Sequence, residues 1–414
     1  MKTTLATFAL VAFVLARPAM AADTIVSKWV QLGPGGTVEA RVVTSTPSCP
    51  SISIDGATSP MGLRATPDPA FNVRLCSATI PKSAKSAGVA GEALPLWRGE
   101  ANRIVVIGDT GCRIKGSAVQ DCNDPAKWPF AQTTHEAAKL KPDLVLHVGD
   151  YLYRENACPP DDKGCAGTPS GDNWPTWNAD FFTPATPLLA AAPWVFVRGN
   201  HEDCSRAGAG WLRLLGPLSF TPGAACAAHV AAYAVLLGPM SLIVMDDANA
   251  PDQYGDSNLI PTYASEFASL AKLTKGPAWL TMHRPLWGAI SGPLGLTVGG
   301  NRTMIAALKS PHQLDSIGLM LSGHIHSFEA MNYRDAPPQL VAGNAGTMLD
   351  SAPVDLSGVN LSGTAITEGL SLPGFGLLLL TRDGSAWNAD EYRGDGTVAR
   401  HCRLVGRKLD CGKL

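Results

Sequence analysis

Charge is scarce in this chain, and neither sign prevails. The 414 residues include 33 Lys and Arg against 35 Asp and Glu, so that charged residues make up 16% and the formal net charge is −2. A protein that binds nucleic acid usually needs an excess of positive charge to neutralise phosphates. The composition therefore argues against a nucleic-acid partner.

Beyond its first residues, the sequence also lacks an apolar run of membrane-spanning length. The later run FGLLLLT, near residue 375, is only as long as a strand. The N-terminus differs, because an early Lys, an apolar run and then Ala19-Met20-Ala21 predict a signal peptide over residues 1–21. An uncleaved anchor is the alternative, but Arg17 and Pro18 interrupt an apolar run that is already short. We expect an exported protein, periplasmic or secreted, that is free of the membrane once the signal is removed.

No C-x-x-C pair occurs among the ten cysteines, which counts against a thiolate metal site. An even number of cysteines behind an export signal instead predicts disulfides. The sequence does not decide their connectivity. Pairing of sequence neighbours would give Cys49–Cys76, Cys112–Cys122, Cys158–Cys165, Cys204–Cys226 and Cys402–Cys411.

Residues 22–98 predict a small β-rich domain. Short runs that alternate apolar and polar residues, such as TIVSKWVQL and TVEARVVT, are separated by Gly and Pro turns. The stretch 81–101, rich in Ala, Gly and Ser, is typical of a linker. We expect a second and larger domain over residues 99–414.

That larger region carries a different pattern, in which continuous apolar runs end in polar residues. Continuous runs predict strands that are buried on both faces, and apolar residues near helical spacing predict helices at 128–141 and 263–274. Together they indicate a layered α/β domain. Residues 376–411 predict closing hairpins, whereas 351–373 has no clear period and suggests a loop. The six apolar runs are RIVVIGD (103–109), LVLHVGD (144–150), WVFVRGN (194–200), SLIVMDD (241–247), AWLTMH (278–283) and GLMLSGH (318–324).

Polar side chains gather at the ends of five of these runs. Ligands of α/β domains bind at the carboxyl ends of strands, and a protein gains no packing from polar groups collected at one edge. Two carboxylates, a carboxamide and three imidazoles can hold two cations about 3.5–4 Å apart, which clamp the attacking and leaving oxygens of a phosphoryl displacement. The residues concerned are Asp109, Asp150 with Tyr153, Asn200-His201-Glu202, His283, and His324 with His326.

In order, these motifs resemble the five blocks of calcineurin-like metallophosphoesterases, and the purple acid phosphatase branch most closely. GDTG, GDYLY, GNHE, TMH and GHIH match D-x-G, G-D-x-x-Y, G-N-H-D/E, V-x-x-H and G-H-x-H, over about residues 105–346. One departure is Leu280, where the fourth block usually has Val. The resemblance implies an α/β fold, a layered β-sandwich flanked by helices, preceded here by a small all-β domain.

The resemblance also implies a ligand set. Many metallophosphoesterases carry Asp-x-His in the first block, but Gly111 occupies the His position here. In the purple branch a tyrosinate takes that role, which points to Tyr153, or to Tyr151 if the loop register differs. The first metal, Fe(III), would then use Asp109, Asp150, Tyr153 and His326, and the second, Zn, Mn or Fe(II), would use Asp150, Asn200, His283 and His324. His201 would face the substrate as the catalytic residue.

The function implied is a phosphatase that cleaves phosphomonoesters by attack of a metal-bound hydroxide. A phosphodiesterase or nucleotide pyrophosphatase of the same fold is one alternative. A degenerate, non-catalytic phosphate-binding module is another, although no ligand position has been lost if Tyr153 is a ligand. Two local questions stay open: whether Trp174 and Trp177 wall a substrate pocket or pack the insert 156–193, and whether the disulfides beside the motifs stiffen the site or stabilise the protein generally.

Overall fold

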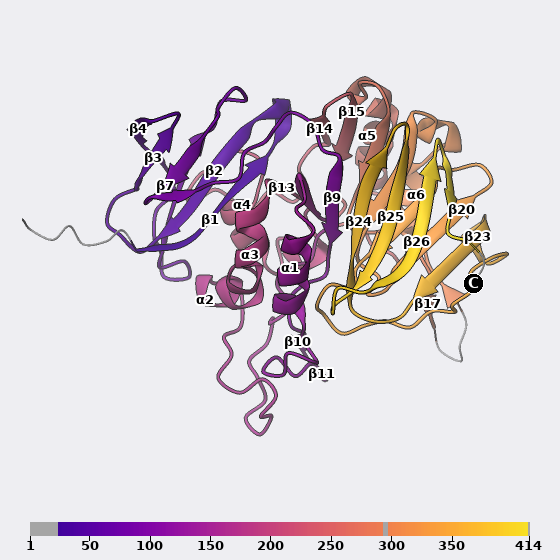
Figure 1. Ribbon diagram of the computed structural model, residues 1–414. Coiled ribbons are helices and arrows are strands. Elements are labelled where there is room, and N and C mark those ends of the chain that lie inside the picture. Colours follow the sequence, from indigo (N-terminus) through magenta and orange to yellow (C-terminus); the bar gives the residue numbers. More distant parts are fainter. Residues whose placement is uncertain (1–23, 293–296, 413–414) are drawn as a thin grey trace, which may run out of the picture.

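The computed structural model describes residues 24–292 and 297–412. Two large β-sheets pack face to face, and helices cover their outer faces (Figure 1). The layers therefore run helix, sheet, sheet, helix, which confirms the predicted fold class. The predicted signal peptide, residues 1–21, lies outside the described residues.

The first sheet has eleven strands. In sheet order they are β27 (Lys408–Asp410), β26 (Val398–Val405), β25 (Ala386–Arg393), β24 (Gly376–Asp383), β9 (Arg103–Ile107), β12 (Leu144–His147), β13 (Trp194–Phe196), β1 (Ile25–Leu32), β2 (Val38–Thr44), β6 (Arg74–Thr79) and β5 (Gly62–Ala65). Strands β9, β12 and β13 run parallel, and the predicted hairpins of 376–411 extend the sheet antiparallel to β9.

The second sheet has eight strands. In order they are β14 (Tyr233–Leu237), β15 (Met240–Val244), β16 (Ala278–Thr281), β19 (Ile317–Ser322), β21 (Gln339–Ala342), β20 (Phe328–Tyr333), β23 (Thr364–Leu372) and β22 (Asn360–Leu361). Strands β15, β16, β19 and β21 run parallel. Small sheets pair β4 (Ala57–Pro60), β3 (Ser51–Ile54), β7 (Ala87–Val89) and β8 (Glu92–Ala93); β10 (Ile114–Lys115) and β11 (Ala118–Val119); and β17 (Ile290–Ser291) and β18 (Thr297–Val298).

The helices confirm both helical predictions with small shifts in their bounds. The helix expected at 128–141 is α1 (Phe130–Lys139), and the one expected at 263–274 is α5 (Ile260–Leu273). The others are α2 (Trp174–Trp177), a π-helical turn (Asn178–Phe182), α3 (Thr183–Ala191), α4 (Gly208–Leu214), α6 (Arg302–Ala307) and short 3-10 turns at Pro34–Gly36, Asn200–Glu202 and Pro311–Leu314.

Each central strand buries both of its faces, which explains the continuous apolar runs. In β9, Ile104 and Val106 pack between the two sheets, while Val105 and Ile107 pack against the helical layer of α1 and α3. The second sheet repeats this, with Leu321 of β19 inside and Met320 against the layer of α5 and α6. Because a strand alternates its faces residue by residue, burial on both sides requires apolar side chains throughout.

The N-terminal strands continue the first sheet. Strand β1 pairs with β13 in parallel through Gln31 and Trp194, and β2, β6 and β5 follow antiparallel. The prediction of a linker at 81–101 is wrong in part, because β7 and β8 pair with β3 and with each other there. Val89, Leu94 and Trp97 are buried in the core between the sheets. The many Ala and Gly residues conceal this strand pair, since they carry little strand preference.

The expected loop at 351–373 is likewise partly strand. Most of β23 pairs antiparallel with β20, and β22 folds back onto β23. A register shift between Asn332 and Tyr333 interrupts this pairing, so apolar residues do not alternate regularly along β23.

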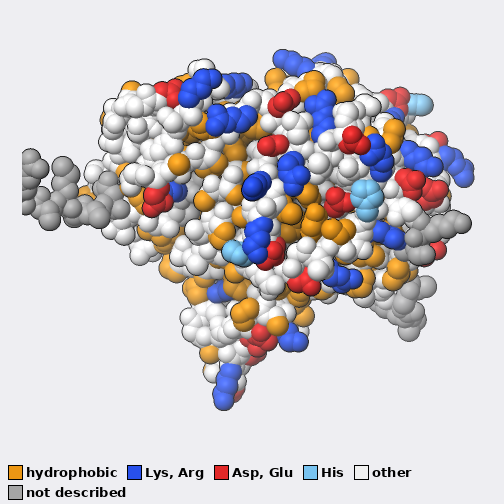
Figure 2. Space-filling model, viewed as in Figure 1, with side chains coloured by type: hydrophobic (Ala, Val, Ile, Leu, Met, Phe, Trp, Pro, Cys, Tyr) orange, Lys and Arg blue, Asp and Glu red, His pale blue; other side chains and the backbone are white. Residues whose placement is uncertain are grey.

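Five disulfides link all ten cysteines in the neighbour pairs considered from the sequence. Disulfides persist in oxidising compartments, which agrees with an extracellular or periplasmic location. Within the part of the chain that the structure describes, no helix has both the length and the apolar character to cross a membrane. Side chains of both signs are interspersed on the face drawn in Figure 2, as the small net charge leads one to expect.

Candidate metal centre

The loops that follow the parallel strands of both sheets converge at one edge of the sandwich. Asp109 follows β9, Asp150 and Tyr153 follow β12, and the 3-10 turn with Asn200 and His201 follows β13. From the second sheet, His283 follows β16, and His324 and His326 follow β19. The structure therefore brings together all eight residues predicted for the site. All are buried except His324, whose side chain is 24% exposed.

The Tyr153 hydroxyl lies at the centre of one half of this cluster. It is 2.8 Å from Asp109 Oδ1, 2.8 Å from Asp150 Oδ2 and 3.0 Å from His326 Nε2. One phenolic proton cannot be donated fully to the two carboxylates at once, whichever tautomer His326 adopts. A cation shared by these oxygens and the nitrogen would resolve the conflict, so the donor set fits a metal ion.

Tyr151, the alternative, points elsewhere. Its hydroxyl donates to the carbonyl of Val197 at 2.8 Å, and its ring stacks on His147 in the core. A histidine at position 111 would not fit either, because a Cβ on Gly111 would lie 2.6 Å from the Tyr151 carbonyl and 2.8 Å from the Tyr153 amide nitrogen. The backbone of the Tyr153 loop therefore occupies the space that a first-block histidine would need.

The other half of the cluster centres on Asp150. Asp150 Oδ2 lies 3.2 Å from His283 Nε2, and Asn200 Oδ1 lies 3.0 Å from the same nitrogen. Asp150, His283 and His324 offer ligand atoms within 4.8 Å of one another. Asp150 thus belongs to both halves, as a carboxylate that bridges two cations would.

Each of the three imidazoles has one nitrogen held from outside the cluster. His283 Nδ1 lies 2.8 Å from the Val148 carbonyl oxygen, His324 Nε2 lies 2.9 Å from Asp252 Oδ2, and His326 Nδ1 lies 3.4 Å from Asp350 Oδ2. Such contacts orient metal-binding histidines and leave the second nitrogen free for the ion. Sequence reasoning missed Asp252 and Asp350, because both lie outside the motifs.

The ionisation of the cluster also suits a cation. Burial alone would raise the pKa of Asp150, but the charges of His283 and His201 hold that pKa well below its usual value. Burial and the Asp109 carboxylate raise the pKa of Tyr153 well above its usual value. The phenol would therefore keep its proton in the absence of a metal, whose positive charge reverses this preference.

The backbone is strained where it carries these ligands. Asp109, Asp150 and His324 have φ values of 57°, 59° and 71°, in the left-handed region that side chains other than Gly rarely adopt. Each such residue costs on the order of 1–3 kcal/mol and persists where the surroundings enforce it. The His324 amide donates to Asp109 Oδ2 at 2.9 Å, so one ligand helps to fix another.

Three further buried carboxylates accept hydrogen bonds from backbone amide groups of the loops that carry the candidate ligands. Asp180 accepts from Cys112, Tyr153 and Arg154; Glu202 accepts from Gly199, Asp150, Tyr151 and Leu152; and Asp247 accepts from His283 and Arg284. Burial and the neighbouring Asp150 raise the pKa of Glu202 to about 8. Asp180 and Asp247 lie outside what sequence reasoning had identified, although the run SLIVMDD ends on Asp247.

The sequence model of the calcineurin-like phosphoesterase family matches residues 102–328, which is more than half of the chain. The chain belongs to the calcineurin-like phosphoesterase family. This family uses a dinuclear metal centre, and the cluster around Asp150 provides donors of the required kind.

Two solved structures share the fold of this phosphoesterase. Purple acid phosphatase PPD1 from yellow lupin (Lupinus luteus) seeds aligns with a TM-score of 0.60 at 14% identity, covering 92% of this chain and 74% of that one. PhoD aligns with a TM-score of 0.58 at 12% identity, covering 96% of this chain and 94% of that one. Identities this low establish the fold alone. No curated protein sequence matches the chain.

In the phosphoesterase, His201 lies beside the cluster. Its amide donates to Asp150 Oδ1 at 2.8 Å, its Nε2 is 3.8 Å from Asp150 Oδ2, and its Nδ1 is 2.7 Å from Glu155 Oε1. Burial lowers the pKa of His201 to about 4, even though Asp150 and Glu155 act in the opposite direction. Arg206 pairs with the same Glu155 carboxylate. Neither Glu155 nor Arg206 was identified from the sequence.

A cavity of about 400 Å³ opens beside His324 of the phosphoesterase. Pro285, Ile290 and Ile325 supply apolar walls, and Gln253 and Arg302 supply polar groups. Its position next to a candidate ligand suits the organic part of an ester substrate.

The two tryptophans of the insert pack rather than line this cavity. Trp177 is fully buried, its ring centroid lies 6.0 Å from that of Tyr151, and Trp174 packs on Phe182. At the bottom of Figure 1, the rest of the insert and the β10–β11 hairpin extend away from the two sheets.

Proposed function

We propose that this protein is an exported phosphatase with two metal ions that hydrolyses phosphomonoesters. The observation that carries the proposal is the position of Asp150, whose carboxylate contacts the Tyr153 hydroxyl on one side and His283 Nε2 on the other. The five disulfides support export. The partner is a small phosphate ester, with no nucleic acid and no membrane.

In this proposal each donor has a role. Asp109, Asp150, Tyr153 and His326 would hold Fe(III), and Asp150, Asn200, His283 and His324 would hold Zn, Mn or Fe(II). Two such cations polarise the phosphate and supply a nucleophile near neutral pH. His201 would steady a phosphate oxygen or protonate the leaving group, with Glu155 at its other nitrogen, 2.7 Å away.

The proposal is tested by elemental analysis together with two substrates. Purified protein should carry two metal ions per chain, lose its activity on chelation and regain it on metal addition. It should hydrolyse p-nitrophenyl phosphate faster than bis-p-nitrophenyl phosphate. A metal-loaded protein that cleaves neither ester would overturn the assignment as a phosphatase, and a preference for the diester would favour a phosphodiesterase.

Tyr153→Phe should abolish a visible absorption band without unfolding the protein. A phenolate bound to Fe(III) gives a broad charge-transfer band, and Phe keeps the packing of the ring on His201, whose centroid lies 3.8 Å away. Because the variant loses an anionic donor, the first ion should also bind more weakly. Visible spectra and metal content after dialysis measure both effects.

Tyr151→Phe is the matched control for this variant. It removes a phenol that donates to the Val197 carbonyl, away from the cluster, and should leave colour and iron content unchanged. A colourless native protein with stoichiometric Fe(III), or a band that survives in Tyr153→Phe, would show that the tyrosinate assignment is wrong.

A further inference from the structure

Three arginines lie around the candidate metal centre. Arg284 Nη1 is 3.3 Å from His324 Nε2, Arg206 Nη1 donates to the Asn200 carbonyl at 3.0 Å, and Arg113 Nη2 is 3.5 Å from His326 Nε2. Each arginine therefore adjoins a residue proposed as a ligand. They differ in what else they contact.

Two of the three guanidinium groups are already neutralised. Arg206 is paired with Glu155, and Arg284 is paired with Asp252. Arg113 makes no ion pair with any carboxylate in residues 24–292 or 297–412, and its Nε is buried without a hydrogen-bond partner. Its guanidinium instead lies over the Tyr153 ring, 4.9 Å from the centroid. Of these three arginines, Arg113 is thus the one whose charge is not compensated by a described carboxylate.

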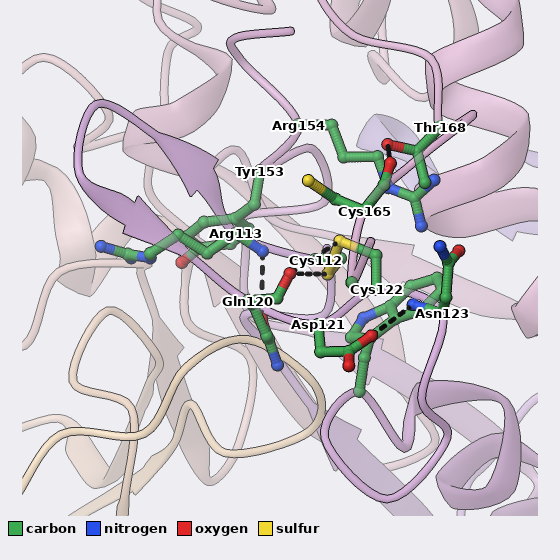
Figure 3. Close-up of a disulfide and its surroundings, with 12 residues drawn as sticks. Cys112, Arg113, Gln120, Asp121, Cys122, Asn123, Tyr153, Arg154, Cys165 and Thr168 are labelled. Atoms are coloured by element: carbon green, nitrogen blue, oxygen red, sulfur yellow. Dashed lines mark hydrogen bonds between the residues drawn. A yellow bond between two sulfur atoms is a disulfide. The ribbon is translucent and has the colours of Figure 1, made fainter. Parts of the chain in front are cut away.

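The backbone of Arg113 is firmly held. The residue follows Cys112, which is linked to Cys122. The Arg113 amide donates to Gln120 Oε1 at 3.0 Å, and the Gln120 amide donates to the Arg113 carbonyl at 2.7 Å. Figure 3 shows the arginine running alongside Tyr153 from this disulfide-linked hairpin. Because the backbone of Arg113 is already fixed, its guanidinium can bind a ligand with little loss of backbone entropy.

Arg154, the neighbouring arginine, is not free to bind a substrate. It is next to Tyr153 in the sequence, but its Nε lies 2.6 Å from Asp180 Oδ1 and its side chain is 4% exposed. It also stacks on Trp128. Its charge stabilises the Tyr153 loop and is not available to a substrate.

We propose that Arg113 binds the non-bridging oxygens of the substrate phosphate and thereby favours monoesters over diesters. This inference rests on the proposed function, in which a metal occupies His326 Nε2 and the contact of Arg113 with that nitrogen is given up. A guanidinium fork matches two phosphate oxygens at once. A monoester offers three non-bridging oxygens and up to two negative charges, whereas a diester offers two oxygens and one charge. The Arg113 guanidinium should therefore bind a monoester more tightly than a diester.

The direct test measures binding of inorganic phosphate to metal-loaded protein by calorimetry. Arg113→Gln should raise the dissociation constant about 10- to 100-fold, the range expected on loss of a charge-assisted hydrogen-bonded contact. Arg113→Lys keeps the charge but not the fork and should fall between Gln and wild type. Lys127→Gln, which removes an exposed charge near the same hairpin, should bind phosphate as the wild type does. Unchanged phosphate binding by metal-loaded Arg113→Gln overturns the proposal.

Steady-state kinetics on two esters test the specificity. In Arg113→Gln, kcat/KM for p-nitrophenyl phosphate should fall more than kcat/KM for bis-p-nitrophenyl phosphate, and equal losses would overturn the preference for monoesters. If Arg113→Gln fails to retain its metals, the losses of kcat/KM on the two esters are compared in Arg113→Lys instead, and equal losses would again overturn the preference for monoesters. A wild type that cleaves neither ester would count against the proposed function, while the phosphate titration would still decide whether Arg113 binds phosphate.

Discussion

Asp150→Asn should abolish hydrolysis and lower metal content at both positions. The Asp150 carboxylate meets donors of both halves of the cluster, with Oδ2 at 2.8 Å from the Tyr153 hydroxyl and 3.2 Å from His283 Nε2. Asn keeps the shape but removes the charge that would offset two cations. Because loss of a single electrostatic contact commonly costs 10²–10³-fold, we expect kcat to fall by at least about 10³-fold. Elemental analysis and p-nitrophenyl phosphate turnover measure the two effects.

Asp161→Asn is a suitable control, because Asp161 is an exposed carboxylate in the insert. It should keep both metals and normal turnover. Full occupancy and wild-type activity in Asp150→Asn would show that Asp150 does not bridge the two ions. Loss of one ion with the other retained would limit Asp150 to a single position.

His201→Ala should leave both metal ions in place and reduce kcat by about 10²–10⁴-fold, the usual contribution of a general acid. The side chain lies beside Asp150, but it is the His201 amide, which alanine retains, that donates to the Asp150 carboxylate. The imidazole is thus placed to act on a substrate rather than to hold an ion. Metal analysis beside kcat separates these two roles.

Two companion variants sharpen this result. Glu155→Gln removes the charge 2.7 Å from His201 Nδ1 and should reduce kcat less than His201→Ala, because Glu155 acts through the histidine. His312→Ala changes an imidazole that is 87% exposed and should behave as the wild type does. If His201→Ala loses metal in proportion to activity, His201 is a ligand and the assignment as an acid is wrong.

The central strands could be predicted because burial on both faces leaves a strong local signal. All six predicted apolar runs contain strands of the two sheets, and the helices at 128–141 and 263–274 were recognised by their spacing. The prediction failed at 81–101 and 351–373, where strands pair with little apolar content or with a shifted register. In such segments the pairing partner, rather than the local pattern, determines the strand.

The candidate ligands were also accessible from the sequence, because each follows a strand within a short motif. The residues that hold these ligands in place could not be predicted from the sequence. Asp252 holds His324 from a loop 72 residues away along the chain, and Asp180 holds the amide of Tyr153 from the π-helical turn. Such partners are brought near by the fold and lie outside every motif, so only a contact in space identifies them.

By itself, the sequence determined the layered fold, the order of the polar motifs and the absence of a histidine at position 111. Tertiary structure decided which tyrosine hydroxyl lies among the candidate ligands. Tyr151 and Tyr153 are separated by one residue, yet one hydroxyl donates into the core at Val197 and the other lies among Asp109, Asp150 and His326. Tertiary structure likewise decided which arginine keeps its charge, since Arg154 pairs with Asp180, whereas Arg113 pairs with no carboxylate among the residues that the structure describes. The physical reason is the same in both cases: the direction of a side chain and the partners that neutralise it are set by loops from distant strands.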